Sequence, residues 1–171
     1  KWTINRRVKV IPNGVNDLSK YKAQRSLSDS HIVLGYLGRF GSEKNIDSLI
    51  DSLLCLPDNL RNRLKVELLG PKTEEYDKLV SKVKLNNLEN NVVFLGAYFG
   101  EDKYKIMQKW TGYIHVAHSD VVSIAVMEAF SIGLPAIIAR TCHVSYYYRS
   151  NAFIMVEPHP LSIAQGINEF M

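Results

Sequence analysis

The sequence predicts an α/β fold in which a doubly wound parallel sheet carries helices on both faces. The first observation is that short runs rich in β-branched residues alternate with helical patterns along most of the chain. The second is size, because 171 residues with 46% hydrophobic content are enough for one well-buried core. Strand, helix, strand order implies parallel pairing with both faces covered. In such sheets ligands bind outside the carboxyl ends of the strands, so the loops after strands are where a site is expected.

Each expected strand is a short apolar run with β-branched or aromatic side chains, and each expected helix has apolar residues near helical spacing. The expected strands are 8–11, 32–37, 66–69, 92–95, 113–117, 136–139 and 153–156. The expected helices are 46–56, 74–85, 101–110, 123–132 and 161–171. The expected loops are 27–30, 70–73 and 141–151, and the last holds three tyrosines in a row that suit a flap or a contact surface for another domain.

The overall charge favours an anionic partner without identifying it. Lys and Arg number 21 against 17 Asp and Glu, which gives a net charge of +4. The basic residues are scattered, which argues against nucleic-acid binding. The two cysteines, Cys55 and Cys142, have no Cys/His spacing typical of metal ligands, so neither a disulfide framework nor a structural zinc site is expected.

The chain has no segment resembling a signal peptide or a membrane span. Its longest apolar stretch, 121–139, is interrupted by Glu128, Gly133 and Pro135. We therefore expect a cytoplasmic protein, in which the positive charge also suits peripheral contact with a membrane surface. The chain begins with Lys1 and runs directly into RRVKVIPNGV, so we expect it to be a piece of a longer protein.

The stretch 121–139, VVSIAVMEAFSIGLPAIIA, contains one ionisable residue, Glu128. Burying an unpaired carboxylate costs several kcal/mol, about 2–7 or more by transfer estimates, so an apolar helix must neutralise it or supply partners. Two explanations follow. Either Glu128 lies at a site where ligand and solvent satisfy it, or it pairs with a protein cation such as Arg140.

The loop after the expected strand 32–37, in LGYLGRFGSEKNIDSLI, carries Arg39 and Lys44 just before a helix. A helix start offers unpaired N–H groups and partial positive charge, so two cations beside it favour a diphosphate site. Arg39 could hold two phosphate oxygens at once, and Lys44 could act as a point charge. The pattern matches neither GxGxxG nor GxxxxGK[ST]. The alternative is that both cations are solvent-exposed side chains on a turn and bind no ligand.

Together with later segments, this loop resembles the GRLxxxKG signature of retaining nucleotide-sugar glycosyltransferases with the GT-B fold, the large group called family 4. VIPNGVN at Val10 is similar to the family's VIPNGVD. LLG at Leu68, NVVFLG at Asn91 and YIHVAHSD at Tyr113 follow in the family's order. The stretch 121–139 is similar to EGFGLVLLEAMACGLPVI, in which two acidic residues are separated by seven others; here they are Asp120 and Glu128.

Such enzymes have two Rossmann-like domains with the active site in the cleft between them. The resemblance implies that 1–171 is the single C-terminal, donor-binding domain and that the N-terminal acceptor domain is absent from this chain. It implies a nucleotide-sugar-dependent hexosyltransferase of polysaccharide biosynthesis that uses a UDP- or GDP-sugar and a glycan or lipid-linked acceptor. The isolated domain is expected to bind the donor but hardly to transfer sugar.

The resemblance also implies residue roles. Arg39 and Lys44 would bind the donor diphosphate, Glu128 would accept hydrogen bonds from ribose hydroxyls, and Asp120 would meet the donor sugar. The remaining contacts would come from backbone N–H groups near Ser123, Ile124 and Ala125, and from Ala97 and Tyr98 against the base.

The expected chemistry needs no cofactor beyond the donor substrate. Breaking a sugar-diphosphate bond leaves negative charge on the departing phosphate, and fixed cations aimed at that charge lower the barrier. Arg39 and Lys44 could therefore replace a divalent metal, and the sequence has no DxD motif to hold one.

The sequence departs from the family in the segment that should meet the sugar. Asp120 stands where the family usually has Glu, and Val121, Val122 and Ser123 replace Gly, Phe and Gly. Side chains at glycine positions narrow the space, so we expect an altered sugar pocket with nucleotide binding retained. The alternatives are a catalytically degenerate nucleotide-binding or scaffolding domain and, less favoured by the paired acids, another GT-B enzyme such as a sugar-nucleotide epimerase.

Several aromatic and histidine residues are expected to have structural roles. His115 and His118 flank a strand end, and His118 is close enough in sequence to Asp120 to reach the cleft. Trp110 and Tyr104, at helical spacing, are expected in the core. In RTCHVSYYYRS, which replaces the family's glycine-rich turn, we expect a surface histidine at His143.

Overall fold

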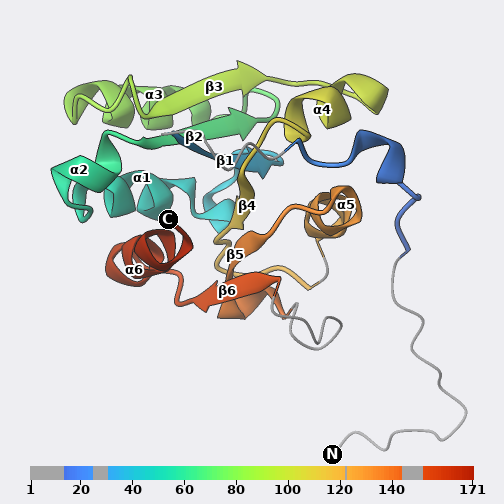
Figure 1. The fold of residues 1–171 in the computed structure, drawn as a ribbon. Coiled ribbons are helices and arrows are strands. Elements are labelled where there is room, and N and C mark those ends of the chain that lie inside the picture. The colour runs from blue at the N-terminus through green and yellow to red at the C-terminus, as the bar shows by residue number, and fades with distance from the viewer. Residues whose placement is uncertain (1–13, 25–30, 122, 144–151) are drawn as a thin grey trace, which may run out of the picture.

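The computed structural model describes residues 14–24, 31–121, 123–143 and 152–171. Within them, six parallel strands form one sheet in the order β3-β2-β1-β4-β5-β6 (Figure 1). This confirms the α/β, Rossmann-like, doubly wound sheet. The strands are β1 (Ile32–Leu37), β2 (Leu64–Leu69), β3 (Val92–Gly96), β4 (Gly112–His115), β5 (Ala136–Ala139) and β6 (Phe153–Val156). The strand expected at 8–11, the loop at 27–30 and the tyrosines at 146–148 lie outside the described residues.

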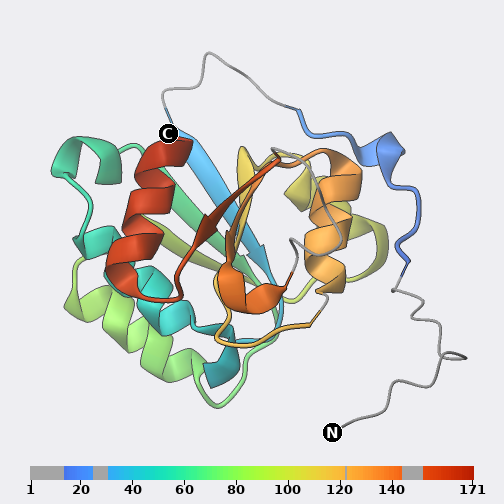
Figure 2. The same cartoon turned by 90° about the horizontal axis from the view of Figure 1, so that it is seen from below.

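Helices cover both faces of the sheet, as the strand-helix order implies (Figure 2). On one face α1 contacts both α3 and α6. On the other, α5 packs beside the short turn η1, and the ring of Tyr21 in η1 lies 5.1 Å from that of Tyr104 in α4. The helices and the 3-10 turn named here are α1 (Ile46–Leu54), α3 (Tyr76–Leu85), α6 (Pro160–Phe170), α4 (Gly100–Met107), α5 (Ile124–Ile132) and η1 (Ser19–Tyr21).

The central strands are short and apolar because they are covered on both sides. Every residue of β4 and of β5 is buried, as expected for strands of a covered parallel sheet. Gly35 in β1 lies under the indole of Trp110, where a Cβ would come within 1.9 Å of the ring. Trp110 is fully buried, which confirms its expected place in the core.

Helix ends differ from the expectation by one to three residues, each for a local reason. Helix α1 ends at Leu54 instead of 56, because Leu56 precedes Pro57 and the residue before proline disfavours helical geometry. Helix α4 ends at Met107 instead of 110, since Trp110 bonds to Met107 in a tighter turn. The short helix α2 (Asp58–Arg61) was not expected.

The turns around these elements include η2 (Ser42–Lys44) after β1 and η3 (Arg140–Cys142) after β5. The order of strands reverses between β1 and β4, so connections leave the sheet in opposite directions there. This is the switch point at which doubly wound sheets bind ligands. No helix within the described ranges is both long and apolar enough to cross a membrane.

Candidate functional site

A pocket of about 510 Å³ lies at the carboxyl ends of β1, β2 and β3, where α4 and α5 begin. We call it the strand-end pocket. It brings together six of the nine residues that the sequence assigns to the donor: Arg39, Ala97, Tyr98, Ile124, Ala125 and Glu128. The rest of its lining is Leu37, Gly38, Leu69, Gly70, Pro71, Phe99, Gly100 and Lys103. Lys44, Asp120 and Ser123 are outside that lining.

The Glu128 carboxylate in this pocket is buried, with 7% exposure. Lys103 Nζ donates to both carboxylate oxygens, at 2.8 and 3.0 Å, and the Tyr104 hydroxyl donates to Oε1 at 2.8 Å. Burial, together with the negative charge of Glu128, raises the pKa of the Tyr104 phenol. The carboxylate is therefore satisfied by two neighbours on α4.

This arrangement corrects the expectation that ligand and solvent alone satisfy Glu128. A protein cation pairs with it, although the cation is Lys103 and not Arg140, which instead lies 3.2 Å from Glu157. No sequence pattern singles out Lys103, because a lysine on a weakly apolar helix is usually solvated. Tyr104 has a role beyond the core position that we expected.

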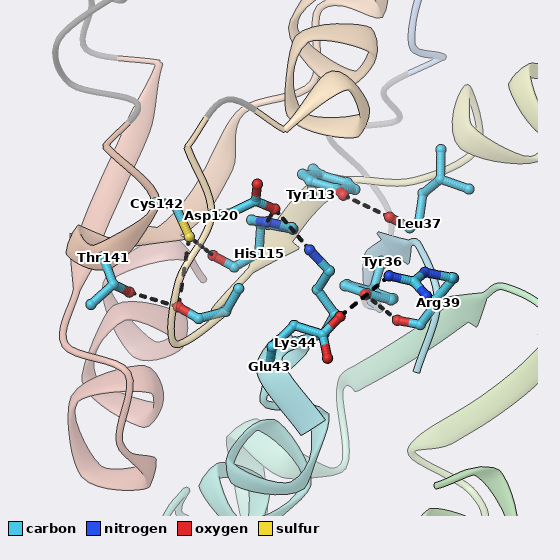
Figure 3. A network of polar contacts seen from close by, with 11 residues as sticks. Tyr36, Leu37, Arg39, Glu43, Lys44, Tyr113, His115, Asp120, Thr141 and Cys142 are labelled. Atoms are coloured by element: carbon cyan, nitrogen blue, oxygen red, sulfur yellow. Dashed lines mark hydrogen bonds and ion pairs between the residues drawn. The ribbon is translucent and has the colours of Figure 1, made fainter. Parts of the chain in front are cut away.

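Arg39 reaches the strand-end pocket from the loop after β1. Its side chain is 74% exposed and lies 3.6 Å from the Glu43 carboxylate, a distance that leaves the guanidinium free to bind other anions. Its backbone carbonyl accepts a hydrogen bond from the Tyr36 hydroxyl at 2.8 Å (Figure 3). Burial raises the pKa of Tyr36, so this phenol stays a donor and fixes the loop.

Lys44 has a different partner from the one that the sequence suggests. Its ammonium lies 3.0 Å from Asp120 Oδ2, and His115 Nε2 lies 3.0 Å from the same oxygen (Figure 3). The hydrogen bond with His115 and then the one from Lys44 lower the pKa of Asp120, against the opposing effect of burial. The structure therefore joins Lys44 to Asp120 across the switch point and separates it from the pocket that holds Arg39.

His115 is an internal support for this ion pair. Its side chain is 2% exposed, and its ring lies nearly parallel to those of Tyr36 and Tyr113, with centroids 6.2 Å from each. A carboxylate oxygen only accepts, so Nε2 donates in the contact with Asp120, while Nδ1 has no partner among the described residues. The histidine that reaches Asp120 is thus His115 and not His118, whose backbone N–H donates to the Glu43 carbonyl.

Asn45 fixes the loop after β1 to the rest of the sheet edge and was not found from the sequence. Its side-chain amide donates to the carbonyls of Val116 and Pro158, both at 3.0 Å. It is buried and adopts φ 59°, a left-handed conformation that Asn tolerates better than most residues. The loop that carries Arg39 and Lys44 is thereby tied to β4 and to the start of α6.

Two helices begin at the strand-end pocket, α4 at Gly100 and α5 at Ile124. The first turn of α1, the helix beside which the sequence places the diphosphate, lines a separate pocket that contains Asp47. Ile124 and Ala125 are the first residues of α5, and Ser123, its N-cap, makes no side-chain capping bond in the described structure. The first N–H groups of α5 therefore remain available to an anion.

In the altered segment 120–123, Val121 is 70% exposed, while Asp120 and Ser123 are half-buried. Val122 lies outside the described residues. Among the residues that the structure describes, no three His, Cys, Asp or Glu side chains gather closely enough to hold a metal ion.

The fold and the strand-end pocket define an α/β domain with a pocket at the strand ends of a doubly wound sheet. Residues 18–171 match the family described as glycosyl transferases group 1, and the chain belongs to this family. The lipopolysaccharide glucosyltransferase WaaG of Escherichia coli K12 is 23% identical over 177 residues, covering 96% of this chain and 46% of that protein.

Solved structures show the same fold. The crystal structure of WaaG, a glycosyltransferase involved in lipopolysaccharide biosynthesis, has a TM-score of 0.77 at 19% identity over 95% of this chain and 46% of its own. Anabaena Alr3699/HepE in complex with UDP-glucose has a TM-score of 0.74 at 23% identity, covering 91% of this chain and 45% of its own. This chain therefore spans less than half the length of these relatives.

Proposed function

We propose that this chain is the C-terminal, donor-binding domain of a retaining, family 4 glycosyltransferase with the GT-B fold. The donor would be a UDP- or GDP-activated hexose, and the acceptor would be a glycan or a lipid-linked sugar bound by an N-terminal domain. One observation carries the proposal: the strand-end pocket gathers an exposed cation, a helix start without a side-chain cap and a buried carboxylate, from Arg39, α5 and Glu128.

These groups match the parts of a nucleotide sugar. Arg39 and the first N–H groups of α5 would bind the diphosphate, and Glu128 would accept a hydrogen bond from the ribose. The apolar lining by Ala97 and Tyr98 would face the base. Because negative charge grows on the departing phosphate, cations and amide dipoles fixed there stabilise the transition state more than the ground state. The UDP-glucose complex of Anabaena Alr3699/HepE supports this ligand class.

The Lys44–Asp120 pair lies beyond this pocket at the end of β4, where we propose that the transferred sugar is bound. Asp120 would accept a sugar hydroxyl. Lys44, at 19% side-chain exposure, would act on the diphosphate through its charge. No metal is required by this proposal, because Arg39 and Lys44 supply the positive charge.

Calorimetric titration of the full-length protein with UDP and GDP tests the proposal. We expect one nucleotide to bind with a dissociation constant between micromolar and millimolar, and Arg39→Ala and Glu128→Ala each to weaken it about tenfold or more, as loss of a charged hydrogen bond does. Lys105→Met, on the solvent side of α4, should have no effect. Binding of neither nucleotide would refute the proposal.

A second candidate is a catalytically degenerate nucleotide-binding or scaffolding domain. It is favoured by the position of Lys44, which is engaged by Asp120, and by Val121, which projects where the family has glycine. Sugar transfer by the full-length protein separates the two. If the full-length protein binds a nucleotide but transfers no sugar, the second candidate stands. If it transfers sugar and Arg39→Ala and Glu128→Ala leave the rate unchanged, the roles proposed for these two residues are wrong.

A further inference from the structure

Lys103 is a second cation in the strand-end pocket, and it faces Glu128 instead of solvent. Its side chain is 21% exposed, and its ammonium contacts both oxygens of the buried carboxylate. It also lies over the ring of Tyr104, 4.8 Å from the centroid, so its position is defined from two sides.

The contacts leave the carboxylate with limited room for a ligand. A carboxylate offers about four lone-pair sites. Oε1 already accepts from Lys103 and Tyr104, while Oε2 accepts only from Lys103 among the described residues. The open acceptor position is therefore on Oε2. It suits one ligand hydroxyl better than two hydroxyls that donate to one carboxylate oxygen each.

The pair also solves an electrostatic problem of this pocket. A negative carboxylate beside a diphosphate repels it. The Lys103 ammonium, 2.8 and 3.0 Å from the two carboxylate oxygens, cancels the charge of Glu128 locally, so a hydroxyl can donate to the carboxylate while a diphosphate binds nearby.

We propose that Lys103 and Tyr104 are positioning residues that orient the Glu128 carboxylate so that Oε2 accepts a hydrogen bond from a single ribose hydroxyl of the donor. The inference rests on the proposed function and adds to it the residues that select a ribonucleotide. The ring of Tyr104 packs against that of Tyr21 in η1, with the ring centroids 5.1 Å apart. The η1 segment thereby helps to place the tyrosine that orients Glu128.

The test compares UDP or GDP, whichever binds, with its 2′-deoxy and 3′-deoxy analogues by calorimetry on the full-length protein. One analogue should bind wild type about tenfold more weakly than the parent, as loss of one hydrogen bond to a charged group implies. Lys103→Met should weaken the binding of the parent nucleotide by a similar factor, about tenfold. The same substitution should hardly change the binding of the analogue that wild type binds more weakly. Lys103→Arg should restore most of the discrimination, since it keeps the charge.

Lys105→Met is the matched control, because Lys105 lies on the same helix but pairs with Asp102 on the surface. Tyr104→Phe is the second variant; it keeps the ring against Tyr21 and removes only the hydroxyl, so it should fold and lose part of the discrimination. Wild type that binds neither nucleotide would refute the proposed function itself. Two other outcomes would refute the positioning role alone. In one, wild type binds the parent nucleotide and its analogues equally well. In the other, Lys103→Met lowers the affinity for the parent and for the analogue by the same factor.

Discussion

The Lys44 ammonium lies 3.0 Å from the Asp120 carboxylate and so joins the loop after β1 to the loop after β4. Each side chain is 19% exposed, and His115 contacts the same carboxylate oxygen from inside the sheet edge. Two residues that the sequence assigns to phosphate and to sugar thus form an ion pair with each other. A donor bound here would have to compete with this pair or bind beside it.

Asp120→Asn should destabilise the protein at pH 7 and less so in acid. Because the pKa of Asp120 is lowered, its contribution to folding is fully present above the pKa of an unfolded aspartate, about 3.9, and is lost progressively as the pH falls from that value through the pKa of the folded state. We expect the substitution to lower the free energy of unfolding by about 1–3 kcal/mol at pH 7, which is the usual cost of losing hydrogen bonds to a charged group. Urea unfolding at pH 7 and pH 3 measures the difference between the two proteins.

The control for that experiment is Asp102→Asn, because Asp102 forms an exposed pair with Lys105 on α4. An exposed pair of this kind contributes about 0.3–0.5 kcal/mol, so little change is expected at either pH. A difference between wild type and Asp120→Asn that is the same at pH 7 and pH 3 would contradict the role assigned to the cluster.

Asn45→Gly should cost about 1–3 kcal/mol in unfolding free energy, because two carbonyls lose the donor that satisfies them. Asn45→Ala should cost about 1 kcal/mol more, since φ 59° is unfavourable for alanine but not for glycine. Asn87 is a matched control, as it has φ 54° but is exposed, so Asn87→Gly should be neutral. Equal stability of the two Asn45 variants would contradict the backbone part of this argument.

Gly35→Ala should destabilise the sheet by at least about 2 kcal/mol, because the added methyl would overlap the Trp110 ring. The indole cannot move away easily, since it is fully buried and its Nε1 donates to Glu67 at 2.9 Å. Gly14→Ala, where no atom lies within 4 Å of the new carbon, should change stability by less than about 0.5 kcal/mol. Thermal unfolding of the two variants gives the comparison; similar melting temperatures would show that Trp110 repacks.

The fold could be predicted because its signals are local. The bounds of β1, β5 and β6 agree with the sequence pattern, since each is a short apolar run with clear ends. Strand β4 ends at His115, two residues earlier than expected, because the Val116 carbonyl is bound by the Asn45 side chain and not by a neighbouring strand. Such a contact between distant segments leaves no periodic trace in the sequence.

The candidate site was predicted only in part for the same reason. Motif spacing located Arg39 and Glu128, which share the strand-end pocket. It did not show that Lys103, 25 residues before Glu128, would pair with it, or that His115 would support Asp120. Helical periodicity tells which face of α4 turns inward, but the partner on that face depends on how α4 crosses α5.

Glu43→Gln should strengthen the binding of a nucleotide diphosphate to the full-length protein. Glu43 is the anion nearest to Arg39, at 3.6 Å, and both side chains are largely exposed. An exposed pair of this kind is worth about 0.2–1 kcal/mol, so releasing Arg39 should raise affinity by a factor of about 1.4 to 5. The gain should shrink as salt is raised from 0.01 to 0.15 M, because the Debye length then falls from about 30 to 8 Å.

In an Arg39→Ala background the same change should have a smaller effect, since only the general repulsion between Glu43 and the diphosphate is then relieved. Calorimetric titration of the four proteins at two salt concentrations measures the coupling; an equal gain with and without Arg39 would mean that Glu43 acts on the ligand directly and not through the arginine.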